Sequence, residues 1–155
     1  MKTAILSLAL LAAVFARPVH TFAQMKTKPK TVINHVAQYV VDLQVSTEFY
    51  QKVIGLDTIP EPFHDGRHTW FSIGDFAHLH IISGAKNKIE HDKNSHLCFS
   101  TSDMASFITN LKSRNISFES WAGEKGGVTK RTDGIQQIYF KDPDGYWIEV
   151  NDDHR

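Results

Sequence analysis

Cysteine is almost missing from the sequence: Cys98 is the single one among 155 residues. A disulfide within the chain is therefore excluded, and no cysteine near the N-terminus could carry a lipid anchor. A lone thiol is compatible with an oxidising compartment when it is buried. We therefore expect Cys98 to be a small buried apolar side chain rather than a metal ligand.

An excess of charge is missing as well, because 17 basic residues balance 17 acidic ones. A protein that binds nucleic acid or an anionic membrane surface through its charge needs a basic patch, and the composition does not indicate one. The expected partner is a small-molecule substrate, with no nucleic acid and no membrane association once the leader described below is removed.

Long apolar runs are also scarce, and the clearest one covers Ala4 to Ala16. It is shorter than the roughly 20 residues that cross a bilayer. Small residues follow at Thr21 and Ala23, in the spacing that a signal peptidase reads. We therefore interpret residues 1–23 as a cleaved signal peptide, with cleavage after residue 16 as the alternative, and expect an exported protein, periplasmic or secreted. Residues 24–31 form a polar, lysine-rich, flexible lead-in.

What the sequence does contain is an internal repeat. His35 is followed by Asp42, and His96 is followed by Asp103 at the same spacing, 61 residues later. Each histidine lies in a strand-like run, and each aspartate precedes a helical pattern. The pattern predicts one domain over residues 32–152, built from two units at 32–84 and 95–152.

Each unit reads as strand, helix and then three strands. The first helix should end at Gly55, and the second at Asn115, which can adopt the left-handed conformation. The glycine-rich stretch 121–134 has no such pattern, and we expect it to be a mobile loop over a cleft. The predicted later strands are 56–59, 67–73 and 76–83 in the first unit, and 116–120, 135–141 and 146–151 in the second.

A single such unit covers one sheet face with its helix and leaves the other face bare. Two units can bring their bare faces together. The sequence therefore predicts an α+β fold in which two tandem β-α-β-β-β units form a barrel-like mixed sheet, with a metal cleft inside and the helices outside.

Alternation along the strands selects the residues of that cleft. His35, His80, His96 and Glu149 each lie on the strand face opposite their aliphatic neighbours. Imidazole and carboxylate groups are ligands of divalent transition metals, and their inward placement is costly without a partner. We predict that these four residues converge on one ion, with His78 as the alternative to His80.

Aromatic residues on the same inward faces should contact the substrate. The predicted cleft residues are Tyr39, Trp70 and Trp147, together with Trp121 from the glycine-rich loop. The remaining histidines fall in predicted turns or at chain ends, where we expect them to be solvated: His64, His68, His91 and His154.

Three segments carry a family resemblance: "NHVAQYVVDLQVSTEFYQKVIGLD", "SHLCFSTSDM" and "FKDPDGYWIEV". Together they resemble the vicinal oxygen chelate superfamily, the glyoxalase/bleomycin-resistance/dioxygenase group. The resemblance implies metal ligands at His35, His80, His96 and Glu149, and one divalent ion of zinc, nickel, cobalt, manganese or iron. It also implies that Glu149 is the proton shuttle if the reaction is an isomerisation. His80 stands where glyoxalase I usually has glutamate, and this departure weakens the transfer of the exact glyoxalase I reaction to this chain.

The resemblance favours a metal-dependent glyoxalase-like lyase or isomerase that acts on a small oxygenated substrate. The alternatives are a non-haem iron dioxygenase of the same fold and a non-catalytic, ligand-sequestering protein of the bleomycin-resistance kind. The two units can pair within one chain or across a homodimer, and the sequence leaves both arrangements open.

Overall fold

The computed structural model describes residues 31–153, and residues 33–155 form one compact unit of the chain. The predicted signal peptide and nearly all of the lead-in lie outside the described residues. No helix within the described part of the chain is long and apolar enough to cross a membrane.

The first unit follows the predicted order of elements. Asp42 caps its helix by accepting a hydrogen bond from the Val45 N–H at 3.0 Å, and Gly55 ends it with a φ of 86°. The last turn before Gly55 is π-helical. The elements are β1 (His35–Val40), α1 (Leu43–Phe49), the π-helical turn η1 (Tyr50–Ile54), β2 (Thr58–Ile59), β3 (His68–Ser72) and β4 (His78–Ser83).

The second unit repeats this plan. Asp103 accepts from the Ser106 N–H at 2.9 Å, and Asn115 ends the helix with a φ of 55°. One strand, β7, was not predicted: it lies in the glycine-rich stretch and pairs with β8, which ties that loop to the sheet. The elements are β5 (His96–Ser100), α2 (Met104–Ser113), β6 (Phe118–Glu119), β7 (Thr129–Lys130), β8 (Gln136–Lys141) and β9 (Trp147–Asn151).

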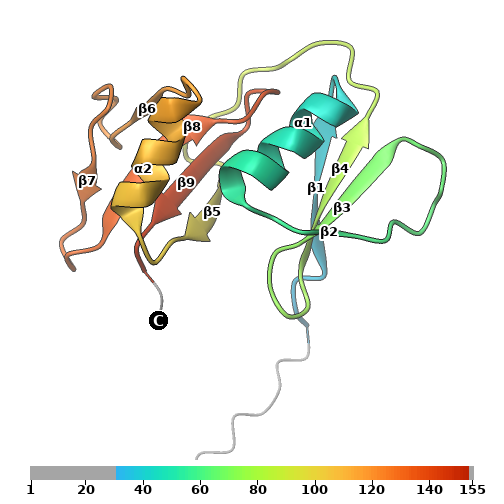
Figure 1. Ribbon diagram of the computed structural model, residues 1–155, viewed down its shortest axis with the longest axis horizontal. Coiled ribbons are helices and arrows are strands. Elements are labelled where there is room, and N and C mark those ends of the chain that lie inside the picture. Colours follow the sequence, from blue (N-terminus) through green and yellow to red (C-terminus); the bar gives the residue numbers. More distant parts are fainter. Residues whose placement is uncertain (1–30, 154–155) are drawn as a thin grey trace, which may run out of the picture. The chain divides into compact units, whose positions relative to one another are not determined.

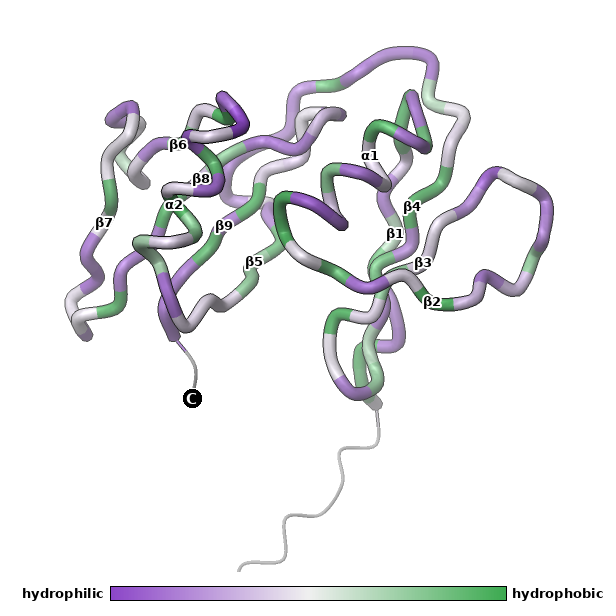
Figure 2. The backbone as a smooth tube through the Cα atoms, in the orientation of Figure 1, coloured by the Kyte–Doolittle hydropathy of each residue, from purple (hydrophilic) through white to green (hydrophobic). Residues whose placement is uncertain are grey.

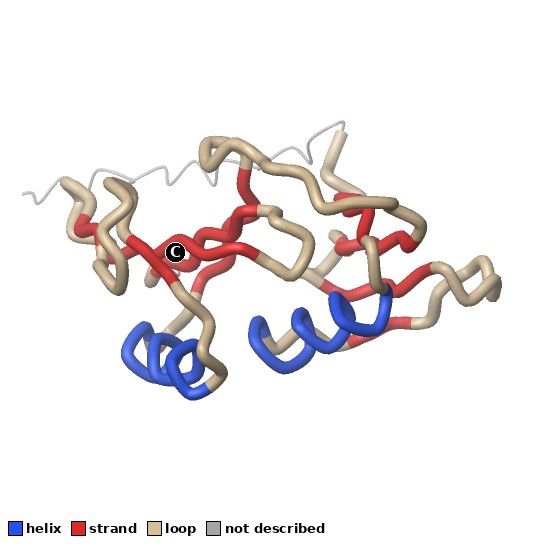
Figure 3. Tube along the Cα trace, turned by 90° about the horizontal axis from the view of Figure 1, so that it is seen from above, coloured by secondary structure: helices blue, strands red, loops and turns tan. Residues whose placement is uncertain are grey.

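The strands form two mixed sheets, one in each unit. The order is β1-β4-β3-β2 in the first and β5-β9-β8-β6 in the second, with β7 attached to β8. The pairs β1–β4 and β5–β9 are parallel and the others are antiparallel. Both helices lie on the same side of the strands (Figures 1 and 3). The α+β fold with two repeated units and outer helices is confirmed. Within the described residues no strand pair joins the two sheets, so one chain does not close a barrel.

The helix side of the sheets forms the core. Four of the aliphatic residues predicted for that face, Leu79, Ile81, Ile148 and Val150, are at most 1% exposed. Apolar and polar residues alternate along the strands that supply them (Figure 2). The opposite face of β1 is open to solvent at His35 and Tyr39. The alternation of side chains from which we predicted the two strand faces is therefore present in the structure.

A buried turn joins the two units. It links β8 to β9 and contains Asp142 and Asp144, which are 5% and 4% exposed. Asp144 accepts hydrogen bonds from the Val41 N–H at 2.7 Å and from the Ser46 hydroxyl at 2.5 Å, both in the first unit. This carboxylate therefore fixes the end of β1 and the start of α1 against the second sheet.

Asp142 makes the second link. It accepts from the Tyr50 hydroxyl at 2.8 Å, and its other oxygen accepts from the backbone N–H groups of Asp144 and Tyr146. Burial raises the pKa of Asp142 above its usual value, although these hydrogen bonds act in the opposite direction. The ionised form therefore costs stability in the folded protein.

Replacing Asp142 by Asn should change how the free energy of unfolding depends on pH, because the variant no longer pays for an ionised carboxylate at this position. The wild-type folded state binds a proton at Asp142 more readily than the unfolded state does, so the wild type should gain stability relative to D142N as the pH falls from 7 through the raised pKa. The gain should be about 1.4 kcal/mol for each pKa unit of elevation. Urea unfolding of both proteins at several pH values measures it. A difference that is constant or changes in the opposite direction would show that the pKa of Asp142 is not raised.

Candidate metal centre

Two predicted ligands meet on the second sheet. His96 lies on β5 and Glu149 on the neighbouring strand β9, and the His96 Nε2 atom is 3.2 Å from Glu149 Oε2. The other ring nitrogen of His96, Nδ1, lies 2.6 Å from the Lys93 carbonyl oxygen. A carbonyl only accepts, so Nδ1 carries a proton and Nε2 is the ring nitrogen that faces the carboxylate.

The surroundings of Glu149 favour its ionised form. Burial alone would raise its pKa, but hydrogen bonds from Tyr139, Asn151 and Cys98 outweigh burial and hold the pKa below its usual value. The Tyr139 hydroxyl donates to Oε2 at 2.5 Å, and the Asn151 amide donates to Oε1 at 2.9 Å. Glu149 therefore keeps its negative charge although its side chain is only 9% exposed.

The Nε2 atom of His96 and an ionised oxygen of Glu149 thus face each other at 3.2 Å. Two acceptors at this distance require a cation, either a second proton on His96 or a metal ion. Two ligands of one ion, at bond lengths of about 2.0–2.2 Å, lie roughly 3–3.5 Å apart. The donor atoms and their separation therefore fit a divalent transition metal.

The other two predicted ligands meet on the first sheet. The rings of His35 and His80 are 5.9 Å apart between centroids. His35 Nδ1 lies 2.8 Å from the Asn34 side-chain oxygen, which leaves Nε2 free. His80 is 6% exposed, and its buried Nε2 has no hydrogen-bond partner among the described residues. Burial lowers the pKa of His80, as do the nearby His68 and His35, so the imidazole is held neutral as a ligand requires.

Trp70 and Phe63 fix the orientation of His80. The Trp70 ring stacks on the imidazole with centroids 4.1 Å apart and planes 22° apart, and Phe63 stacks at 6.0 Å. His78 instead makes an edge contact with Trp70 at 5.9 Å. His80 is thus the residue of the pair with a buried, unpaired nitrogen.

The two half-sets do not converge within one chain. The described residues contain a group of three possible metal ligands whose ligand atoms all lie within 4.8 Å of one another. Its members are Glu61, Asp65 and His68. The four predicted ligands do not form such a group within the described part of the chain. The physical reason is that each unit carries two of the ligands on its own sheet. Whether the four bind one ion stays a prediction.

Three of the four residues predicted to contact the substrate line cavities. Tyr39 lines a cavity of about 320 Å³ with Tyr146 and the segment between the units. Trp147 lines a cavity of about 290 Å³ with His96, and Trp121 lines one of about 360 Å³ with Glu149. Trp70 packs on His80.

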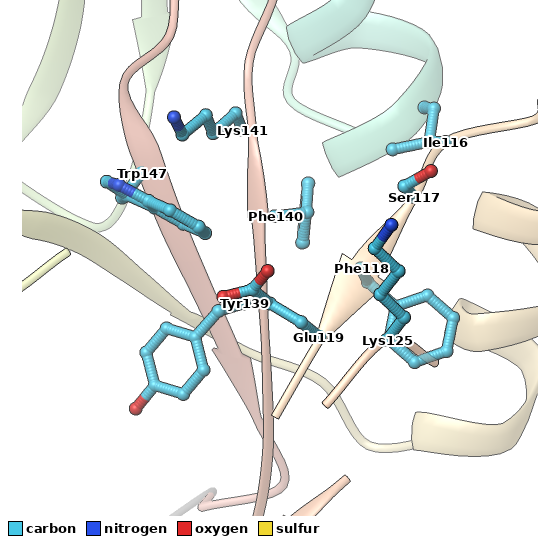
Figure 4. Close-up of a pocket in the computed structure, with 9 residues that line it drawn as sticks. All are labelled: Ile116, Ser117, Phe118, Glu119, Lys125, Tyr139, Phe140, Lys141 and Trp147. Carbon is cyan, nitrogen blue, oxygen red and sulfur yellow. The ribbon is translucent and has the colours of Figure 1, made fainter. Parts of the chain in front are cut away.

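A further cavity, of about 510 Å³, is lined by none of the predicted ligands. Tyr139 and Phe140 project to opposite sides of β8 beside it, and Glu119 and Lys125 add charge (Figure 4). It shares Trp147 with the cavity at His96. We place the chemistry at the smaller cavities because His96 and Glu149 line them.

Reasoning from the sequence did not assign several residues of this region to the site. Tyr139, which bonds Glu149, was predicted only as part of a strand, although its place two residues before the end of β8 puts it opposite Glu149 in register. Lys93 was missed entirely: its ammonium pairs with Glu119 and lies 4.8–5.9 Å from the ring centroids of Trp147, Tyr139 and Trp121.

Three expectations for single residues are corrected. Cys98 is exposed rather than buried, because nothing in the described part of the chain covers its sheet face. His68 lies in β3 with its ring 4.9 Å from that of His80, and His91 stacks on Tyr146 at 3.9 Å, so neither is simply solvated. His64 lies in an exposed turn, as expected, and His154 lies outside the described residues.

Changing Tyr139 to Phe should raise the pKa of Glu149 in the metal-free protein, because the variant loses the hydrogen bond that most lowers this pKa. Carboxyl-carbon NMR titration of Glu149 measures the shift. Tyr146→Phe is the matched control, since the Tyr146 hydroxyl bonds the Tyr39 backbone instead. An unchanged Glu149 pKa in Tyr139→Phe would contradict the assigned hydrogen bond.

The chain is similar in sequence to several known proteins. The chain is 26% identical to "Glyoxylase I 4" of Arabidopsis thaliana over 77% of this chain and 70% of that protein. It is 27% identical to the metallothiol transferase FosB of Staphylococcus epidermidis over 78% of this chain and 81% of that protein.

Solved structures share the fold. "Oxidase ChaP-H2" superposes with a TM-score of 0.68 at 18% identity, over 81% of this chain and 96% of that one. The fosfomycin resistance protein FosX of Listeria monocytogenes superposes with a TM-score of 0.64 at 20% identity, over 80% and 94% of the two chains. The family model of the Glyoxalase/Bleomycin resistance protein/Dioxygenase superfamily matches residues 32–150. The chain belongs to this superfamily.

Proposed function

We propose that the protein is an exported, metal-dependent lyase or isomerase of the glyoxalase type that acts on a small oxygenated substrate. The observation that carries the proposal is the facing pair of His96 Nε2 and ionised Glu149 at 3.2 Å, with the His96 tautomer set by the Lys93 carbonyl. Export follows from the predicted leader, and mass spectrometry of the mature protein tests it.

A second copy of the chain completes the site in this proposal. Each sheet offers two ligands, and two ligands do not hold a catalytic ion, which usually has at least three from the protein. His35 and Tyr39 project from an exposed sheet face. Pairing the first sheet of one chain with the second sheet of another brings His35 and His80 toward His96 and Glu149, and two-fold symmetry forms the site twice.

A bound divalent ion would act as a Lewis acid that stabilises negative charge on substrate oxygens. The residues of this chain have separate tasks around it. His35, His80 and His96 would hold the ion as neutral ligands, and Tyr139 would keep Glu149 in position by its 2.5 Å hydrogen bond. Glu149 is the carboxylate of the set and would move the proton in an isomerisation. Trp70 holds the His80 ring.

Metal content tests the ligand set. The purified mature protein should contain one divalent ion per chain by elemental analysis. Glu149→Gln should weaken binding by more than the roughly 10–100-fold that loss of a supporting hydrogen bond costs, because it removes the charge of a ligand. His80→Ala should have the smallest effect of the four substitutions.

His64→Ala is the control, because His64 is an exposed histidine of a turn. Isothermal titration with zinc compares the variants. If His80→Ala abolished binding and His35→Ala left it intact, the assignment of ligands would be wrong. If the wild type bound no metal, the proposed function would fail.

Complementation tests the shared site. His35→Ala and Glu149→Ala carrying different tags are co-expressed, and the heterodimer is purified through both tags. In a shared site one of the two centres then has four native ligands and the other lacks two. The heterodimer should therefore hold about half of the wild-type metal, while each variant homodimer holds little.

The same experiment distinguishes a site within one chain. Every chain of the heterodimer carries one substitution, so a site built from a single chain would be defective in both copies. A heterodimer with as little metal as the variant homodimers would contradict the shared site, as would a wild-type protein that sediments as a monomer with metal bound.

A further inference from the structure

Lys93 lies in the segment between β4 and β5, three residues before the predicted ligand His96. Its side chain is only 18% exposed. Lysine side chains are almost never buried unless they are paired, so the contacts of this one indicate its role.

The ammonium of Lys93 has its polar partners in the second unit. It forms an ion pair with the Glu119 carboxylate on β6, and it also donates to the carbonyls of Ser120 and Trp121 at 3.4 and 3.3 Å. These three residues lead from β6 into the glycine-rich stretch. The lysine therefore ties the segment between the units to the start of that stretch.

Aromatic rings surround the same ammonium. Its Nζ atom lies 4.8 Å from the ring centroid of Trp147, 5.6 Å from that of Tyr139 and 5.9 Å from that of Trp121. A cation within about 6 Å of an aromatic ring is attracted by it, and more strongly where water is excluded. Three rings and an ion pair together hold the side chain in one position.

The backbone of Lys93 acts on His96. Its carbonyl accepts a hydrogen bond from His96 Nδ1 at 2.6 Å. A tight turn carries this carbonyl: the Ser95 N–H donates to the Asp92 carbonyl at 2.9 Å, and the Asn94 N–H donates to the Asp92 carboxylate at 2.8 Å. The place of the carbonyl thus depends on this turn and on the side chain that fixes Lys93 against the second sheet.

Two acceptors compete for the single ring proton of a neutral His96. The Lys93 carbonyl faces Nδ1, and the Glu149 carboxylate lies 3.2 Å from Nε2. An ionised carboxylate is the stronger acceptor, so without the carbonyl the proton would move to Nε2. Nε2 would then donate to Glu149 and offer no lone pair to a metal ion.

We infer that Lys93 is a positioning residue for His96: its ion pair with Glu119 and its aromatic contacts keep the Lys93 carbonyl on Nδ1, which leaves Nε2 for the metal. This inference rests on the proposed function, in which His96 is a ligand. Partners of the second ring nitrogen fix the orientation of metal-binding histidines, and the loss of one costs roughly 10–100-fold in metal affinity. Here the position of that partner is set from β6, a distant part of the sequence.

The tautomer of His96 in the metal-free protein tests the inference without any metal. Nitrogen-15 NMR distinguishes a protonated Nδ1 from a protonated Nε2 in a neutral imidazole, and comparison with His96→Gln identifies the His96 signals. At a pH at which the ring is neutral, the wild type should carry the proton on Nδ1. Lys93→Met should transfer most of the population to Nε2, because methionine keeps an apolar stem and lacks the ammonium.

Further variants locate the effect in the ammonium. Lys93→Arg should restore the wild-type tautomer, since a guanidinium also pairs with a carboxylate and stacks on aromatic rings. Glu119→Gln should shift the tautomer in the same direction as Lys93→Met, although Glu119 lies on another strand; this variant keeps the test valid even if Lys93→Met folds poorly. Lys141→Met is the matched control and should leave the tautomer unchanged, because the Lys141 ammonium also lies 4.8 Å from the Trp147 ring centroid but belongs to β8.

Zinc titration then measures the consequence for the metal centre. Lys93→Met should bind zinc roughly tenfold more weakly than the wild type, as the loss of a supporting hydrogen bond predicts. Lys93→Arg and Lys141→Met should bind zinc as the wild type does.

The outcomes separate the two proposals. A Lys93→Met protein that keeps the proton on Nδ1 or binds zinc as tightly as the wild type would overturn the inference and leave the proposed function standing. So would a Glu119→Gln protein with the wild-type tautomer. A wild type that takes up no zinc would overturn the proposed function, and the NMR experiment on the metal-free protein would still decide whether Lys93 positions His96.

Discussion

The buried turn between β8 and β9 is the constraint on which the arrangement of the two units depends. Asp142 and Asp144 lie in the second unit, yet they accept hydrogen bonds from the first unit at Tyr50, Val41 and Ser46. Burying two carboxylates is costly unless donors satisfy them, so the turn is stable only with the first unit in place. The same turn leads into β9, and five residues further the chain reaches Glu149. The contact that joins the units therefore also positions a predicted metal ligand.

Reasoning from the sequence predicted the features that depend on local structure, namely the strand faces and the helix ends. Strand alternation depends only on backbone geometry, so the faces of His35, His80 and Glu149 follow from the order of residues along each strand. Helix ends follow similar rules: Asp42 and Asp103 cap as expected, and Gly55 and Asn115 adopt the left-handed conformation. The repeat of 61 residues then extended each assignment from one unit to the other.

What the sequence did not predict depends on contacts between distant segments. β7 forms because Thr129 and Lys130 pair with β8, a partner that their own glycine-rich surroundings do not reveal. The exposure of Cys98 depends on what covers its sheet face rather than on its place in β5. The separation of the ligands into two pairs is of the same kind: alternation places them on inward faces, but the association of sheets decides which faces meet.

The central claim is that one ion is bound by ligands from two chains. A crystal structure of the zinc-loaded protein, with the ion located by anomalous scattering, tests it most directly. The result predicted is one ion at about 2.0–2.2 Å from His35 and His80 of one protomer and from His96 and Glu149 of its partner. An ion bound by Glu61, Asp65 and His68 of a single chain, with His96 and Glu149 still facing each other without metal, would contradict it.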